Sequence, residues 1–413
     1  MNSLQLLLKI LNNKIPKSAL QADIQALKSR DWEELLFEVD KQGVKLILSD
    51  HLRRQGLSEF VPDAILEGLR AANLLTTASN VRILHHAGGI LKAFKKQNLN
   101  VIGLKGLYLV ESIYQHIGSR NIGDLDLLIR KKDLQRALHI MQKLGYKLST
   151  WYDVKAPNKD IKHVPPMFKT SAPPVELHWT ILEEDEPFTI DTKGLWERAL
   201  PATIAGVDML ALSPEDLILH LCLHLTYQHH FNIGLRSLVD VATVLHHFNG
   251  QVDWQKLADI AQGWGATRVL WLSMILVGDI LGIDLPSNLL MQIEPTDPDP
   301  WIIEEARSQL ISKVGDAEKM TPDLAKFAAE RGLIARLRLI LQRIFLPKST
   351  LARHYNVSPR SLRVYGCYFK RAKDLFKQYR GSVKQILDHD ASTLADAKSQ
   401  QNSQSLKNWM GDR

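Results

Sequence analysis

The sequence has very few cysteines and no long apolar run. Its 413 residues include only Cys222 and Cys367, which lie far apart and exclude the disulfide framework of a small secreted protein. No stretch approaches the roughly 18 uninterrupted apolar residues that a membrane-spanning helix needs. The short apolar run at the N-terminus is interrupted by Lys9, which favours an amphipathic helix over a secretory signal. These absences predict a cytoplasmic protein with no membrane partner.

Acidic charge is scarce in one part of the chain. Between residues 331 and 384, fourteen lysines and arginines are opposed only by Asp374. Such a stretch can bind a polyanion such as RNA or the phosphates of a substrate, or it can form a solvated helix face. Within it, residues 365–371 interleave aromatic and basic side chains, a mixture that either stacks on bases or packs a helix onto a domain.

Helical and mixed segments alternate along the chain. Apolar residues recur at helical spacing over residues 1–95 and again over 206–390, where Ser213 followed by Pro214 is a typical helix start. Residues 96–205 contain short apolar strands separated by helices. Residues 391–413 are polar and are expected to be disordered. The predicted fold class is α+β, with a central sheet domain between helical N-terminal and C-terminal regions.

Two aspartates alternate with leucines in a compact strand over residues 124–129. Side chains two residues apart project to the same side of a strand, so Asp124 and Asp126 would lie next to each other on one face. Two neighbouring carboxylates raise each other's pKa, and a divalent cation removes that penalty. Magnesium prefers oxygen ligands and retains several waters. Asp124 and Asp126 are therefore the predicted metal ligands and catalytic residues.

Two neighbouring motifs add to this pair. Upstream, an apolar strand ends at Lys105 and Gly106 before a helix, where a lysine and backbone N–H groups can meet phosphate. Downstream, Glu176 interrupts the apolar strand 175–179 and would complete a site for two metal ions. His178 would share the face of Glu176, where it either contacts the metal shell or the acceptor, or packs as a core histidine.

These motifs together resemble one family. The run LKGLYLVESIYQHIGSRNIGDLDLLI, followed by LGY and VELHW, resembles a nucleotidyltransferase-like family that includes many uncharacterised bacterial proteins. More distantly, it is similar to the abortive-infection toxin nucleotidyltransferases. The resemblance covers about residues 30–250. It implies a DNA-polymerase-β-like nucleotidyltransferase core with a mixed sheet, magnesium-dependent transfer and a nucleoside triphosphate (NTP) donor. On this resemblance Lys105 and Gly106 bind phosphate, while Asp124, Asp126 and Glu176 bind metal.

Three further candidates depend on the resemblance. Arg120 matches the family's arginine four residues before the first aspartate. It would clamp the triphosphate, brace the aspartates or form an ion pair with Asp124. Arg236 and Asp240 match an arginine and an aspartate on a helix beside the nucleotide site of the toxin-like relatives. Their spacing also allows an ion pair within one helix.

A histidine-rich stretch follows the sheet domain. His220 and His224 share one helix face, as zinc ligands can, and His229 and His230 come shortly after. A matching third ligand is not evident, so hydrogen-bonding or structural roles are favoured over a zinc site.

The sequence therefore predicts a transferase that uses Mg²⁺, with Mn²⁺ as the alternative ion, and an NTP donor. It would move a nucleotidyl or related phosphate-linked group to a hydroxyl acceptor. In such families the acceptor is a small molecule, a peptide natural product or a tRNA end. Two alternatives stay open: toxin-like transfer to tRNA, which the basic stretch favours, and a non-catalytic scaffold that keeps the fold and binds RNA or protein.

Overall fold

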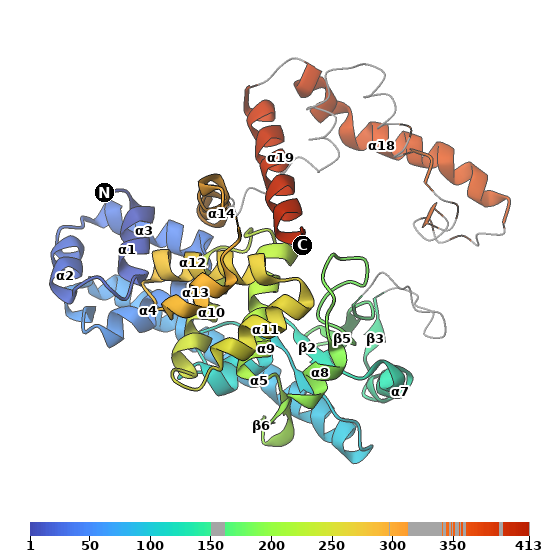
Figure 1. Ribbon diagram of the computed structural model, residues 1–413, viewed down its shortest axis with the longest axis horizontal. Coiled ribbons are helices and arrows are strands. Elements are labelled where there is room, and N and C mark those ends of the chain that lie inside the picture. The colour runs from blue at the N-terminus through green and yellow to red at the C-terminus, as the bar shows by residue number, and fades with distance from the viewer. Residues whose placement is uncertain are drawn as a thin grey trace. The chain divides into compact units, whose positions relative to one another are not determined.

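The computed structural model, drawn in Figure 1, describes residues 1–149, 162–296, 298–312, 341, 344–346, 348, 350, 351, 355, 357, 361–387 and 391–412. The chain divides into two compact units. The first is Met1–Val314 with Trp409–Arg413, and the second is Gly315–Asn408. Every residue proposed for the site from the sequence lies in the first unit.

The N-terminal part of the first unit is helical. Its helices are α1 (Ser3–Leu11), α2 (Lys17–Gln25), α3 (Ser29–Lys41), α4 (Lys45–Arg54), the short η1 (Ser58–Phe60) and α5 (Asp63–Lys96). Asp31 lies in the first turn of α3, where its carboxylate accepts a hydrogen bond of 2.8 Å from the backbone N–H of Lys28. The acid therefore stabilises the helix start from inside the first turn rather than as the cap.

Seven short strands form one mixed sheet. They are β1 (Ile102–Gly103), β2 (Leu125–Leu128), β3 (Lys147–Leu148), β4 (Met167–Phe168), β5 (Val175–His178), β6 (Leu200–Ile204) and β7 (Val207–Ala211). Their order across the sheet is β3-β4-β5-β2-β1-β7-β6. β2 runs parallel to β5 and antiparallel to β1, and β1 runs parallel to β7. This arrangement confirms the predicted α+β class with a mixed sheet.

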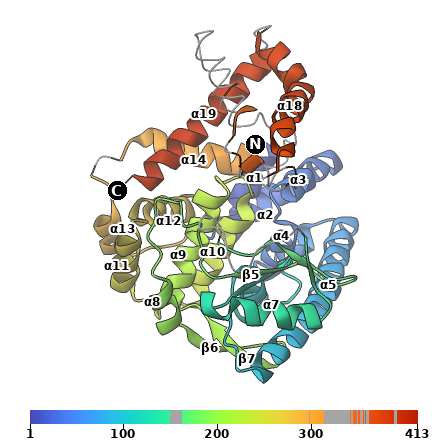
Figure 2. The same ribbon diagram turned by 90° about the vertical axis from the view of Figure 1, so that its right-hand side faces the viewer.

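The two faces of this sheet differ because side chains alternate along β2 and β5. One face is apolar and joins a hydrophobic core with α5 and α7 (Leu134–Lys143); its members include Leu125, Leu127, Val175 and Leu177. Figure 2 shows α5 and α7 beside the strands. The opposite face carries the carboxylates that the sequence analysis singled out.

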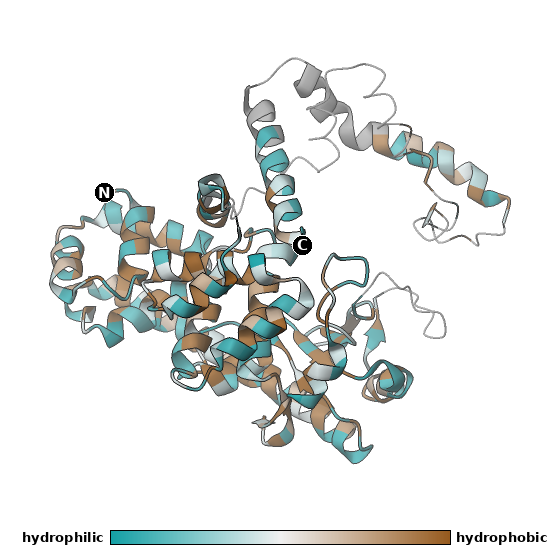
Figure 3. Ribbon diagram, viewed as in Figure 1, coloured by the Kyte–Doolittle hydropathy of each residue, from teal (hydrophilic) through white to brown (hydrophobic). Residues whose placement is uncertain are grey.

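A second group of helices follows β5; its first member precedes β6, and the others come after β7. It comprises α8 (Thr192–Glu197), α9 (Pro214–Leu223), the π-helical turn η4 (His224–Gln228), α10 (Leu235–His247), α11 (Trp254–Trp264), α12 (Thr267–Leu281), α13 (Ser287–Ile293) and α14 (Pro300–Ser312). The predicted helix start is confirmed, since the Ser213 hydroxyl accepts from the backbone N–H of Asp216. Figure 3 shows hydrophobic residues gathered in these helices. Among the described residues, no helix has both the length and the apolar character needed to cross a bilayer.

Segment boundaries differ from those expected. The boundary at residue 205 falls inside the β6–β7 hairpin, and β7 pairs with β1, so the sheet continues to Ala211. The boundary at residue 95 lies at the end of α5, whose inner face packs into the core of the sheet. The polar segment 391–413, expected to be disordered, instead forms α19 (Ala391–Gly411) after α18 (Arg363–Leu387). Alanine and glutamine, both good helix formers, account for this difference.

Two shorter helical segments link β1 to β2: α6 (Lys105–Tyr108) and the π-helical turn η2 (Leu109–Ile113). A third, η3 (Lys131–Asp133), leads from β2 into α7. Residues 151–161 lie outside the described residues, and β4 occupies Met167–Phe168.

Candidate active site

The register of β2 and β5 brings the acids together. Asp126 lies directly opposite Glu176 in the parallel pair, and Asp124 comes two residues earlier on the same face. One ligand atom from each of Asp126, Glu176 and His178 lies within 4.8 Å of the others. The structure thus places the third acid beside the aspartate pair, although 49 residues separate Asp126 from Glu176 in the sequence.

Asp126 is the most deeply buried of the carboxylates, with 2% of its surface exposed. Its Oδ2 lies 3.1 Å from the Nζ of Lys105, and its Oδ1 lies 2.8 Å from the Nε2 of His178. Burial alone would raise the pKa of Asp126. The positive charge of Lys105 and the hydrogen bond from His178 outweigh burial and hold that pKa well below its ordinary value. Asp126 is therefore an anion that already attracts cations.

Glu176 and Asp124, the other two carboxylates near Asp126, differ in their contacts and in the direction of their pKa shifts. Glu176 Oε2 lies 3.3 Å from His178 Nε2 and 3.6 Å from His163 Nε2. The hydrogen bond with His178 lowers the pKa of Glu176 against the opposing effect of burial. Asp124 has an exposed side chain, yet desolvation on its protein side and the charge of Asp126 raise its pKa. An additional cation at Asp124 would relieve that repulsion.

The donor set fits a divalent metal ion. Asp126 and Glu176, on two neighbouring strands, supply carboxylate oxygens of the kind that Mg²⁺ and Mn²⁺ prefer, and Asp124 adds a third carboxylate just before β2 begins. Asp126 contacts Lys105 Nζ at 3.1 Å and His178 Nε2 at 2.8 Å. Among the described residues, the group whose ligand atoms could share one metal ion is Asp126, Glu176 and His178, and Asp124 lies outside that group.

Arg120 has a different partner from the one the sequence suggested. Its guanidinium binds Asp240 through two bonds, Nε to Oδ1 at 2.7 Å and Nη2 to Oδ2 at 2.9 Å, rather than Asp124. The hydroxyl of Tyr114 also donates to Asp240 Oδ1 at 2.7 Å. Asp240 is thus engaged by Arg120 and Tyr114 instead of by Arg236. The network joins the connection between β1 and β2 to helix α10.

Gly106 has a packing role that its sequence context did not reveal. A Cβ atom at this position would lie 2.7 Å from the Nη1 of Arg120. Arg120 cannot easily retreat, because Asp240 holds its guanidinium at two points. Glycine is therefore required for the approach of Arg120, whether or not the backbone also meets phosphate.

Two residues near the acids, Lys162 and His163, escaped the sequence analysis, which named His220 and His229 only for their spacing and not for their place beside the acids. Lys162 lies close enough to Lys105, Asp126 and Glu176 for their charges to act on it; burial is the larger influence, and its pKa is lowered. His163 contacts Glu176, as described above. His220 and His229 lie within electrostatic reach of Lys105 and Asp126. Long-range folding alone brings these residues to the site, so local sequence patterns could not identify them.

The histidine stretch does not assemble a zinc site among the described residues, where the one group of three potential ligands is Asp126, Glu176 and His178. His224 and His229 contact each other through their Nε2 atoms at 3.0 Å. The ring of His220 lies 6.4 Å from that of His224, measured between centroids. The Nε2 of His220 is buried without a hydrogen-bond partner in the part of the chain that the structure describes. Burial lowers the pKa of His220 and of His224 well below the ordinary value, so both are neutral near pH 7.

The neutral histidines make stability depend on pH. Burial and the charge of Lys105 lower the pKa of His229 from 6.5 to about 4. Between about pH 6.5 and pH 4, His229 binds a proton in the unfolded chain but stays neutral in the native protein. The free energy of unfolding therefore falls as the pH decreases through this range. We expect the urea midpoint to decrease from about pH 7.5 to about pH 5, and the decrease to be smaller in His229→Gln. The exposed His139→Gln serves as the control, and equal midpoints at both pH values would contradict the expectation.

Comparison with known proteins agrees with this geometry. A mixed sheet that presents carboxylates from two adjacent strands, with a lysine against one of them, fits a metal-dependent phosphate chemistry. Residues 28–282 match a family described as uncharacterised nucleotidyltransferase, which covers more than half of the 413 residues. The chain belongs to this family. No curated protein and no solved structure matches the chain. The comparison thus supports the nucleotidyltransferase resemblance but not the one to abortive-infection toxins.

Proposed function

We propose that the protein is a magnesium-dependent nucleotidyltransferase that uses an NTP donor and a hydroxyl acceptor. The register that sets Asp126 opposite Glu176, with Asp124 two residues earlier, is the observation that carries this proposal. Family membership supports the reaction class. We place the reaction in the cytoplasm, where the free cysteines Cys222 and Cys367 would stay reduced.

Each group of residues has a distinct task. Asp124, Asp126 and Glu176 would hold Mg²⁺, with Mn²⁺ as the alternative ion. When bound, the metal supplies positive charge to the triphosphate and lowers the pKa of the attacking hydroxyl. The ammonium group of Lys105 contacts Asp126, and it would contact a phosphate oxygen of the bound nucleotide instead. In the transfer, the acceptor oxygen bonds to the α-phosphorus while the bond to the β-phosphate oxygen breaks, and pyrophosphate leaves with that electron pair.

The cationic residues on the other side of the site would orient the phosphates. Arg236 has a buried Nε without a hydrogen-bond partner in the described part of the chain, and its charge acts on His229. Lys162 lies near Lys105. Arg120 is saturated by Asp240, so we assign it a bracing role and give phosphate contact to Lys105 and Arg236. His178 positions Asp126 through its hydrogen bond.

Labelled nucleotides test the reaction. Incubating the protein with Mg²⁺, a cell extract and NTPs labelled at either the α- or the γ-phosphate should transfer label from the α position only. Transfer from the γ position would indicate a kinase and overturn the proposal. Label recovered in tRNA, rather than in a small molecule or peptide, would establish the toxin-like alternative.

One observation in the second unit favours a tRNA acceptor as the second candidate. On α18 the side chains of Phe369 and Tyr365 are 83% and 49% exposed, close to Arg363, Lys370 and Lys373. Exposed aromatic rings among cations stack on bases and bind phosphates. The arginines at 331, 336, 338, 343, 353 and 360 lie outside the described residues. Label recovered in tRNA would strengthen this candidate. So would a separately measured affinity for tRNA that falls steeply as the salt concentration rises.

A further inference from the structure

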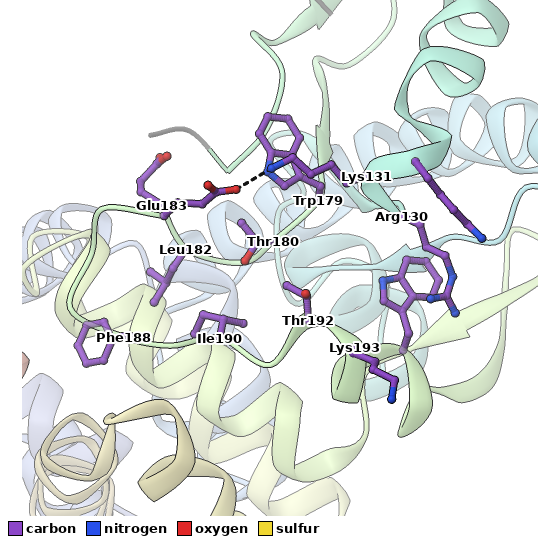
Figure 4. Close-up of a pocket in the computed structure, with 13 residues that line it drawn as sticks. Arg130, Lys131, Trp179, Thr180, Leu182, Glu183, Phe188, Ile190, Thr192 and Lys193 are labelled. Atoms are coloured by element: carbon purple, nitrogen blue, oxygen red, sulfur yellow. Dashed lines mark hydrogen bonds and ion pairs between the residues drawn. The ribbon is translucent and has the colours of Figure 1, made fainter. Parts of the chain in front are cut away.

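A cavity of about 620 Å³ lies beyond the ends of β2 and β5. Figure 4 shows the side chains that line it. Its lining combines four cationic side chains with two tryptophans: Arg130, Lys131, Lys132, Lys193, Trp179 and Trp196. The volume is in the range of small-molecule sites. The acids of the candidate active site are not part of this lining.

Two buried polar atoms of this lining have no partner within the described residues: Nε1 of Trp179 and Oε2 of Glu183. Trp179 is 5% exposed, so water does not freely solvate its indole. A buried donor or acceptor without a partner destabilises a fold, and such atoms in a cavity wall commonly bind a ligand or an ordered water. A ligand oxygen would satisfy the indole N–H, and a ligand hydroxyl or amine would satisfy the carboxylate.

The charge of the lining favours an anion. Lys131 and Glu184 neutralise each other through an ion pair of 2.7 Å. Arg130, Lys132 and Lys193 then remain against the single carboxylate of Glu183, and Lys193 also contacts Glu197 on the outer surface at 3.2 Å. The guanidinium of Arg130 lies 4.4 Å from the ring centroid of Trp196. Its planar group and the tryptophans offer flat surfaces on which an aromatic ring can stack.

The cavity is aligned with the candidate active site. Arg130 lies four residues after Asp126, and Thr180 lies four residues after Glu176. Both residues lie past the last strand positions, Leu128 and His178, so the cavity adjoins the carboxyl ends of the two strands that carry Asp126 and Glu176. Four residues of strand span about 13 Å. A ligand seated in the cavity could therefore extend a hydroxyl group to the acids if it is roughly that long.

We infer that this cavity binds the acceptor, and that the acceptor is a small organic anion with a flat apolar part and a hydroxyl roughly 13 Å away. The acceptor role rests on the proposed function, whereas the binding of a flat organic anion in this cavity does not. The ligand's anionic group would lie near Arg130 and Lys132, and its ring against Trp179 or Trp196.

A fluorescent probe tests the binding site without nucleotide or metal. Titration of the full chain with anilinonaphthalene sulfonate, a flat aromatic anion, should saturate, whereas its uncharged counterpart phenylnaphthylamine should bind more weakly. Replacing Arg130→Gln and Lys132→Gln together should raise the dissociation constant for the anion roughly fivefold to tenfold, since two partly exposed charges are lost. Glu183→Gln removes the opposing carboxylate and should lower the dissociation constant for the anion. Lys143→Gln, on the exposed side of α7, should leave it unchanged.

The opposite directions expected for the two variants separate a charge effect from misfolding. Weak or absent probe binding by the native protein, or equal dissociation constants in all variants, would overturn the binding site.

The acceptor role is tested separately, by splitting the small-molecule fraction of an extract on an anion exchanger before labelling with α-labelled NTP. Labelled product should come from the retained anionic fraction and decrease in the Arg130/Lys132 variant. Product from the unretained fraction would overturn the acceptor role. Absence of product from every fraction would count against the proposed function, while the probe titration would still decide the binding site.

Discussion

Replacement of Asp126 by asparagine should lower magnesium-dependent transfer by about a thousandfold or more. Asparagine keeps the size of the side chain but removes the charge that binds a cation. It also leaves the Lys105 ammonium, now 3.1 Å from the Asp126 carboxylate, without its anion. The rate of α-label transfer measures the loss. Calorimetry should show, in parallel, that NTP binding no longer depends on Mg²⁺.

A matched control is available on the same sheet. Asp208 on β7 is exposed and pairs with Lys95 at 2.8 Å, so Asp208→Asn removes an equal charge away from the acids. Its transfer rate should equal that of the native protein. The scaffold alternative makes the opposite forecast: native protein would bind NTP without regard to Mg²⁺, and Asp126→Asn would change nothing. Glu176→Gln provides a second variant if Asp126→Asn folds poorly.

Replacing Asp240 by asparagine should lower the free energy of unfolding by about 3–5 kcal/mol, because it leaves a buried arginine without its counter-ion. Arg120 and Asp240 have side-chain exposures of 10% and 3%, so water cannot take the place of the lost carboxylate. The amide oxygen of asparagine could still accept from Tyr114, but its NH₂ group would face the Nη2 donor of Arg120 in place of Oδ2. Urea unfolding of the native protein and the variant gives the difference directly.

An exposed ion pair supplies the comparison. Glu34 binds Arg30 at 3.0 Å on the surface of α3, and Glu34→Gln should change the free energy of unfolding by less than about 1 kcal/mol. Replacing both members of the buried pair, Arg120→Met with Asp240→Leu, should recover part of the lost stability. A change below about 1 kcal/mol in Asp240→Asn would show that the pair is not isolated from solvent in solution.

Local patterns in the sequence were sufficient for the α+β class and for the strand that carries Asp126. The alternation of Asp124, Asp126 and apolar residues predicts a strand over 124–129, and the structure has β2 over Leu125–Leu128, with Asp124 just before it. The Ser213 helix start is likewise a short-range feature, since the cap and the N–H that it binds are three residues apart. Such features depend on residues that are neighbours in the chain.

Tertiary contacts decided the rest of the candidate site. Glu176 reaches Asp126 only because β5 pairs with β2 in one register; a shift by one residue would turn Glu176 to the apolar face. Arg120 and Asp240 are 120 residues apart, so a helical spacing rule pointed to Arg236 instead. Lys162 carries no motif, and it lies near the site because its carbonyl accepts from the backbone N–H of Trp179. The helical spacing of His220 and His224 gave no sign that His220 would come within electrostatic reach of Asp126.

The placement of β7 has a consequence for synthesis of the chain. β1 lies between β2 and β7, and its parallel partner residues on β7, Leu210 and Ala211, are translated long after the acids. Asp240, the counter-ion of Arg120, emerges later still. Domains fold as units as the chain leaves the ribosome. A nascent chain therefore holds Asp126 and Glu176 on an unfinished sheet until β7 has been made, and Arg120 has no Asp240 partner until α10 has been made.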